Sequence, residues 1–90
     1  MSKNNHGYHI TDIPRGVYGE SSKIIEEVNE FVDAENQGVT LMVLQELSDV
    51  IGAIDGYLKC HYPSINLSDL VKMSEVTNRA FQSGQRQSKD

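Results

Sequence analysis

The chain has 90 residues, which is enough for one domain with a thin core, because a short chain buries a smaller fraction of its surface than a mid-sized one. Eight Lys and Arg against 13 Asp and Glu give a net charge of -5, which disfavours attraction to a phosphate backbone. We therefore expect no nucleic-acid partner. The first residues lack the apolar core of a signal peptide and no apolar run reaches ~20 residues. We expect no membrane partner and a cytoplasmic location.

The N-terminal part carries no helical period. Residues 1–12 are polar, and residues 13–19 (IPRGVYG) contain turn residues, so they predict an ordered lead-in. The helical period begins after it and predicts a helix over about residues 20–36, with Ser21 and Ser22 as candidate N-caps. One apolar stripe runs along this helix, formed by Ile24, Ile25, Val28, Phe31 and Val32.

A turn and a longer helix follow. Gly38 stands where a left-handed residue is expected after a helix, and Thr40 is a candidate N-cap for the next one. The second helix is predicted over about residues 40–60, since its apolar stripe has no break. That stripe comprises Val43, Leu44, Leu47, Val50, Ile51, Ile54, Tyr57 and Leu58. Its length indicates that it needs partners beyond one chain.

A third helix is predicted after the His61–Ser64 break, beginning at Asn66 or Ser68 and ending at Gly84. The fold class expected is all-α, with an antiparallel helical hairpin plus a third helix. The helical domain would cover residues 13–84, followed by a frayed tail, residues 85–90. We expect these helices to assemble into a multi-helix bundle as a homodimer or a dimer of dimers.

The face of the second helix opposite its stripe carries small residues. Glycine costs roughly 1 kcal/mol against alanine inside a helix, so Gly52 and Gly56 call for a reason. A close crossing with a helix of a second copy, at Gly52, Ala53 and Gly56, is one reason. The alternative is that these small residues leave room for a ligand.

Two pairs of acidic residues occupy matching positions on the first two helices. Glu27 and Glu30 lie about 100° and 160° from the centre of the first stripe. Glu46 and Asp49 have the same offsets, of about 100° and 160°, on the second helix. In an antiparallel pair, equal offsets project to the same side of the shared interface. Positions 27 and 49, like 30 and 46, are also symmetric about Gly38. The sequence therefore predicts that four carboxylates meet in one cleft.

Four carboxylates in a partly desolvated cleft repel one another and need a cation. Oxygen ligands alone select a hard ion, which indicates Mg²⁺, with Mn²⁺ as a substitute. Mg²⁺ is commonly shared with substrate phosphates, so the predicted metal ligands Glu27, Glu30, Glu46 and Asp49 connect the chain to nucleotide chemistry. A single ExxE pair is usually a solvated helix face, but two pairs in register favour a metal site.

The same residues resemble a known family. EEVNE at residues 26–30 and ELSD at residues 46–49 are similar to the EExxE…ExxD motif of MazG-like all-α nucleoside triphosphate pyrophosphohydrolases. RGVYGE at residues 15–20 is similar to the lead-in of small stand-alone, phage-type members, and NRAF at residues 78–81 stands where the family has a basic last helix. The resemblance covers roughly residues 13–86.

The resemblance implies an Mg²⁺-dependent enzyme that cleaves the α–β phosphoanhydride of a (deoxy)nucleoside triphosphate, giving the monophosphate and pyrophosphate. It also implies a dimer or a dimer of dimers. The chain is shorter than the larger members, and its last helix has fewer basic residues than their KFxRRF-like segment. The resemblance therefore leaves the preferred base and sugar open.

Other polar residues are candidates for the same site. Glu26 is a candidate catalytic residue that orients the attacking water, or else a solvated acid. Lys23 is placed to contact a substrate phosphate or to neutralise Glu27. Lys72 and Arg79 are seven residues apart and share a helix face, where they would bind phosphate or form ordinary surface charge.

Histidine and cysteine give weaker signals. His6, His9 and His61 show no metal-ligand spacing, so we do not expect a histidine metal site. Cys60 has no partner cysteine for a disulfide, and we interpret it as a buried thiol.

Two alternative functions stay open. The first is a nucleotidase of narrow specificity, of the all-α dUTPase or dCTPase type, which would share the metal site. The second is a non-catalytic helical adaptor, in which the acidic residues form a solvated face.

Overall fold

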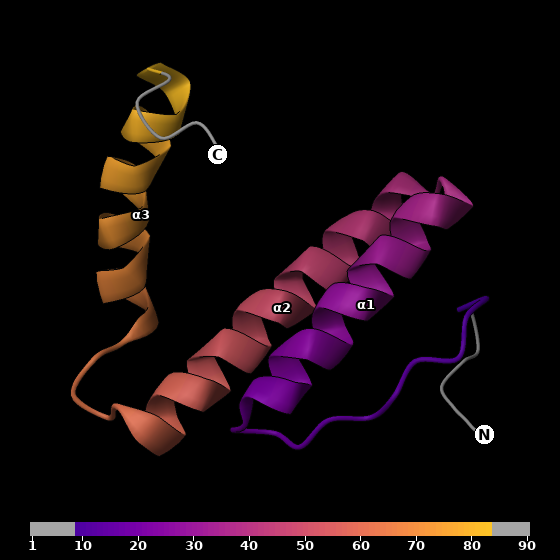
Figure 1. Ribbon diagram of the computed structural model, residues 1–90, viewed down its shortest axis with the longest axis horizontal. Coiled ribbons are helices and arrows are strands. Elements are labelled where there is room, and N and C mark those ends of the chain that lie inside the picture. The colour runs from indigo at the N-terminus through magenta and orange to yellow at the C-terminus, as the bar shows by residue number, and fades with distance from the viewer. Residues whose placement is uncertain (1–8, 84–90) are drawn as a thin grey trace.

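The computed structural model describes residues 9–83, which form a helical hairpin and a third helix (Figure 1). Its helices are α1, Ser21–Gln37; α2, Thr40–His61; and α3, Leu67–Ser83. These bounds lie within one or two residues of the expected ones, and no strand occurs between residues 9 and 83. The all-α prediction, with a hairpin plus a third helix, is confirmed.

Some expectations fall on segments outside the described residues. These are residues 1–8 of the polar N-terminal segment, which include His6, and residues 84–90, which include Gly84 and the tail.

The turn between α1 and α2 forms as the sequence indicates. Gly38 has φ 77° and ψ 19°, in the left-handed region that glycine adopts without a Cβ clash. Its N–H donates to the carbonyl oxygens of Ala34 at 3.2 Å and Glu35 at 3.0 Å, which satisfies carbonyls at the end of α1. Only one further residue, Val39, separates the helices, so α1 and α2 are antiparallel neighbours.

The expected N-caps of α1 and α2 are wrong. Glu20 and Val39 hold the N-cap positions, and neither makes a side-chain capping bond. The hydroxyl of Ser22 instead accepts a hydrogen bond from the N–H of Val17, at 3.0 Å, because the preceding chain folds back over it. Thr40 is already the first residue of α2.

The start of α3 is capped by Asn66. Its Oδ1 accepts the N–H of Asp69 at 3.0 Å, and Oδ2 of Asp69 accepts the N–H of Asn66 at 3.0 Å. This reciprocal pair is a capping box, which explains why the helix begins here. Of the two starts that the sequence offered, Asn66 is the one used.

The hairpin buries acidic side chains and leaves the centres of its apolar stripes exposed. The stripe centres Val28 and Leu47 are 39% and 40% exposed, whereas Glu27 is 6% and Glu46 is 0% exposed. Equal offsets about a shared apolar interface would place the stripe centres between α1 and α2. In the structure these centres lie outside that contact. The helices are rotated so that small residues and carboxylates face inward. The buried apolar side chains among the described residues are Ile13, Ala34, Ala53 and Leu58.

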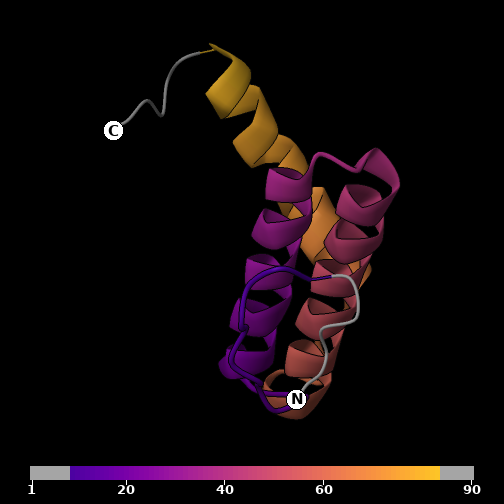
Figure 2. The ribbon, with the colours of Figure 1, turned by 90° about the vertical axis from the view of Figure 1, so that its right-hand side faces the viewer.

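Residues 9–20, which we call the N-terminal strap, run back along the hairpin without regular secondary structure (Figure 2). The far end of the strap is held by Asp33 of α1, whose carboxylate accepts the N–H groups of Ile10 and Thr11. The near end is held by Glu26, whose Oε1 accepts the N–H of Gly16 at 2.9 Å. The expected ordered lead-in is present, and two buried carboxylates fix it.

The strap also covers Gly56 of α2. A Cβ built on Gly56 would stand 2.5 Å from Cζ of Tyr18, and one built on Gly19 would stand 2.6 Å from Sγ of Cys60. The close approach at Gly56 is thus made by the same chain, and our assignment of it to a second copy is wrong. Cys60 is exposed, so its interpretation as a buried thiol is also wrong. Around Gly52, by contrast, no described atom outside its two neighbours and the backbone of α2 lies within 4 Å of a built Cβ.

Helix α3 stands apart from the hairpin (Figure 1). It contacts α2, and within the described residues it makes no comparable contact with α1. None of its residues is buried. None of the three helices is long and apolar enough to cross a membrane.

Candidate metal centre

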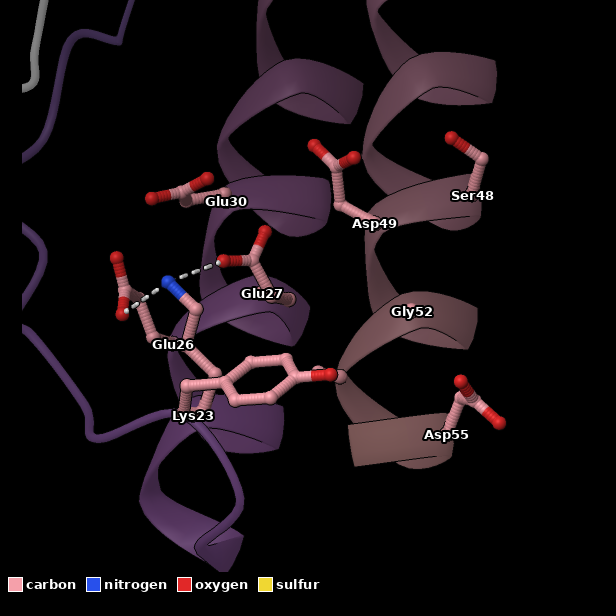
Figure 3. A pocket seen from close by; sticks show the side chains of 10 residues that line it. Lys23, Glu26, Glu27, Glu30, Ser48, Asp49, Gly52 and Asp55 are labelled. Atoms are coloured by element: carbon pink, nitrogen blue, oxygen red, sulfur yellow. Dashed lines mark hydrogen bonds and ion pairs between the residues drawn. The ribbon is translucent and has the colours of Figure 1, made fainter. Parts of the chain in front are cut away.

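The hairpin brings the four predicted ligands together. Single carboxylate oxygens from Glu27, Glu46 and Asp49 lie within 4.8 Å of one another. Glu30 belongs to two further groups of this kind, one with Glu26 and Glu27 and one that includes Glu46. Figure 3 shows Glu27 on α1 and Asp49 on α2 at the space between the two helices, with Glu30 one turn from Glu27 on α1. We call Glu27, Glu30, Glu46 and Asp49 the acid cluster.

The convergence follows from two local features. Each helix carries its pair at i and i+3, so both members lie on one face about one turn apart. The turn at Gly38 then sets the heights, because positions 27 and 49 are each eleven residues from it and positions 30 and 46 are each eight. The sequence thus predicted the heights and the shared faces of these four residues, whereas the rotation that turns those faces inward was not predicted.

The acid cluster is electrostatically strained without a cation. The pKa of Glu30 is raised to about 8, first by burial and then by the nearby charges of Glu27 and Glu46. At neutral pH, Glu30 therefore retains a proton. A bound cation would reverse this preference, because it stabilises the ionised carboxylate.

Glu26 is tied to the strap. It is 8% exposed, and its Oε1 accepts hydrogen bonds from Gly16 N–H at 2.9 Å and from Nζ of Lys23 at 3.1 Å. Burial opposes its ionisation, but these two hydrogen bonds, the charge of Lys23 and a hydrogen bond with Glu30 together outweigh burial and lower its pKa. Glu26 is thus not a solvated acid. It has a structural role that the sequence did not indicate, while its role in catalysis stays a prediction.

Lys23 lies between two carboxylates. Its Nζ is 3.1 Å from Oε1 of Glu26 and 3.1 Å from Oε2 of Glu27 (Figure 3). Burial lowers the pKa of Lys23, but the hydrogen bonds and the negative charges of these two carboxylates together raise it by more. Of the two expected roles, neutralisation of Glu27 is present in the structure. Contact with a phosphate stays a prediction.

A cleft of about 510 Å³ opens beside the acid cluster. This volume lies in the range of small-molecule sites. Lys23, Glu27, Glu30, Asp49 and Gly52 are among the residues that line it. Glu46 is fully buried and does not line this cleft. Gly52, with its open surroundings, fits the alternative that small residues leave room for a ligand.

Lys72 and Arg79 are not brought to this cleft. Both lie on α3 and are exposed, and neither lines the cleft. Within one chain, the described residues thus give the acid cluster a single nearby lysine, Lys23.

His9 is the residue of this region that sequence reasoning missed. Its Nε2 lies 3.5 Å from Oε2 of Glu46 and 3.7 Å from Oε1 of Glu30, and its Nδ1 lies 2.8 Å from Oδ2 of Asp33. Its side chain is only 3% exposed. A search for regularly spaced histidines could not find it, because the strap delivers a single histidine from outside the helices.

Comparison of the chain with models of known protein families, with curated proteins and with solved structures gives no match.

Proposed function

We propose that the protein is an Mg²⁺-dependent nucleoside triphosphate pyrophosphohydrolase of the MazG-like all-α type, converting a (deoxy)nucleoside triphosphate to the monophosphate and pyrophosphate. One observation carries the proposal: two carboxylates from each of two antiparallel helices meet beside a cleft of small-molecule size. The type of reaction is inferred from the resemblance to the EExxE…ExxD motif.

The donor set fits the ion. Carboxylate oxygens are ligands for Mg²⁺ and Mn²⁺. The buried position of Glu27 and Glu46 costs free energy unless their charge is compensated. The raised pKa of Glu30 is further support, since it indicates that ionised carboxylates in the cluster repel one another when no cation is bound.

Each residue then has a role. Glu27, Glu30, Glu46 and Asp49 hold the ion, which supplies Lewis acidity toward phosphate oxygens and lowers the pKa of water. Lys23 neutralises the charge of Glu27, and the ammonium group of Lys23 would contact the phosphates of a bound nucleotide. Reaction geometry is set mainly by these positioned charges, as is general for cleavage of phosphoanhydrides.

Glu26, the candidate catalytic residue, keeps Oε1 on Gly16 and Lys23. Any contact with the attacking water would therefore be made through Oε2. Lys72 and Arg79 remain candidates for binding phosphate only in an assembly that brings α3 over a cleft.

The exposed apolar side chains support such an assembly. Six of them belong to the two apolar stripes of the hairpin, and each is at least 39% exposed: Ile25, Val28, Val32, Leu44, Leu47 and Ile51. Large exposed apolar surface on a small protein marks an interaction site. We propose a homodimer, or a dimer of dimers, in which these side chains are buried between copies.

A pyrophosphate-release screen tests the function. Purified protein is assayed against all canonical ribo- and deoxyribonucleoside triphosphates, with Mg²⁺ and with EDTA. Release that needs Mg²⁺ supports the proposal. Activity confined to dUTP or dCTP identifies the narrow-specificity nucleotidase instead. Absence of release together with a melting temperature indifferent to Mg²⁺ supports the non-catalytic adaptor and ends the proposal.

A further inference from the structure

The strap places an imidazole against the acid cluster. His9 is the only described histidine beside these carboxylates, because His61 lies at the end of α2 and its Nε2 is 3.0 Å from the carbonyl oxygen of Gly19. The side chain of His9 is enclosed between Asp33 on one side and Glu30 and Glu46 on the other.

The hydrogen bonds around Asp33 fix the orientation of the ring. Asp33 accepts the N–H groups of Ile10 and Thr11, the hydroxyl of Thr11 and the amide of Gln37. A carboxylate with this set of donors acts only as an acceptor, so the hydrogen between it and His9 belongs to Nδ1. In the neutral imidazole the lone pair is then on Nε2, which faces Glu30 and Glu46.

The distances suit a shared cation. An octahedral ion with bonds of about 2.1 Å has adjacent donors about 3.0 Å apart and opposite donors about 4.2 Å apart. The two distances from Nε2 of His9, 3.5 Å to Glu46 and 3.7 Å to Glu30, exceed the adjacent spacing by about 0.5 and 0.7 Å, so small side-chain shifts would bring both carboxylates beside Nε2 on one ion. A carboxylate that accepts the other ring N–H is the usual support of a metal-bound histidine, and Asp33 supplies it at 2.8 Å.

We propose that His9 is a nitrogen ligand of the metal centre, binding a divalent cation together with Glu30 and Glu46 while Asp33 orients its ring. This inference rests on the metal centre of the proposed function. It adds a ligand from outside the two helices and gives the strap a direct part in binding the ion.

A nitrogen ligand changes which ion is preferred. Imidazole suits transition ions better than Mg²⁺, which favours oxygen. The wild-type protein should therefore prefer Mn²⁺ over Mg²⁺ by a larger factor than a variant without His9. His9→Gln keeps a polar side chain of similar reach, and His61→Gln is the matched control.

The test uses Mn²⁺ alone, without nucleotide, and electron spin echo modulation, which detects nitrogen bound directly to the ion. We expect ¹⁴N modulation in the wild type and in His61→Gln, and its loss in His9→Gln. In wild-type protein with ¹⁵N-labelled histidine the pattern should change to that of ¹⁵N, so the result does not depend on whether a variant folds. Asp33→Asn should keep the modulation while Mn²⁺ affinity falls about 10-fold or more.

The outcomes separate the two proposals. Mn²⁺ bound without histidine nitrogen modulation in the wild type overturns the role of His9 and leaves the carboxylate centre standing. Modulation that persists unchanged in folded His9→Gln overturns it as well. Failure of the wild type to bind Mn²⁺ at millimolar concentration contradicts the metal centre itself, and His9 as its ligand with it.

Discussion

The backbone N–H of Gly16 donates a hydrogen bond to Oε1 of Glu26 at 2.9 Å, and this bond ties the strap to the start of α1. The strap lies so close here that a Cβ built on Gly16 would overlap the backbone carbonyl of Ser22. Backbone atoms cannot move aside as a side-chain end can. Glycine is therefore required at position 16 because the backbone of Ser22 lies too close for a Cβ, and not because of the φ angle of Gly16.

We expect Gly16→Ala to lower the free energy of unfolding by about 1–3 kcal/mol, because the added methyl forces the strap away from Glu26. Gly52→Ala is the matched control, since its Cβ meets open space and alanine is the better helix former. That variant should be more stable by roughly 0.5–1 kcal/mol. Urea denaturation of both variants measures the effects. Equal stability changes would show that the strap does not pack as described.

Asp33 makes stability depend on acid. Burial opposes its ionisation, but hydrogen bonds from Thr11, His9 and the N–H of Ile10 hold its pKa at about 2, below the ordinary value of 3.8. A lowered pKa in the folded state gives stability that is present above the unfolded pKa and lost as pH falls toward the folded one. The contribution should therefore disappear between about pH 4 and pH 2.

Asp33→Asn should then lower the free energy of unfolding by about 2 kcal/mol at pH 7, and by much less near pH 2. Urea denaturation of wild type and variant across this pH range provides the measurement. A difference that stays constant with pH would contradict the role given to the Asp33 charge.

Glu30 has the opposite pH dependence. Its folded pKa of about 8 lies above the ordinary 4.5, so its ionisation opposes folding increasingly as pH rises from about 4.5 to 8. In metal-free protein at pH 8, Glu30→Gln should raise the free energy of unfolding by about 1–3 kcal/mol, with little effect near pH 4.5. The same variant should abolish pyrophosphate release. A destabilised variant at pH 8 would mean that Glu30 is not in a repulsive cluster.

The sequence was a good guide where local rules decide. The helix bounds follow from apolar period and from Gly38, and the acid cluster follows from i and i+3 spacing across a short turn. The strap was beyond such rules, because His9 and Tyr18 reach their positions through contacts with Asp33 and α2 that no local period encodes. The burial of the stripes was also misjudged, since a period shows that a face is apolar but does not show whether its own chain covers it.

Metal dependence can be tested on Asp49. Its Oδ1 accepts a hydrogen bond from Gln45, and it belongs to the acid cluster with Glu27. Added Mg²⁺ should raise the melting temperature of the wild type, since an ion bound only by the folded state stabilises it by mass action. Asp49→Asn should lose this shift and the activity. Asp55→Asn is the control, because Asp55 lines the same cleft but pairs with Lys59 at 2.9 Å. Equal Mg²⁺ shifts in the two variants would exclude Asp49 as a ligand.

The last prediction concerns the exposed stripe of α1. Val28 lies at its centre and is 39% exposed, while the neighbouring Asn29 is also exposed but points about 100° away. If the stripes are buried between copies, a charge at Val28 would lie in an apolar interface without a partner, which is costly. Static light scattering of the wild type at micromolar concentration should give a multiple of the 10.1 kDa chain mass. Val28→Lys should dissociate the assembly or weaken it at least 10-fold, whereas Asn29→Lys should leave it intact. A folded wild-type protein that scatters as a single 10.1 kDa chain would refute the assembly, and an undisturbed Val28→Lys oligomer would show that copies meet through another face.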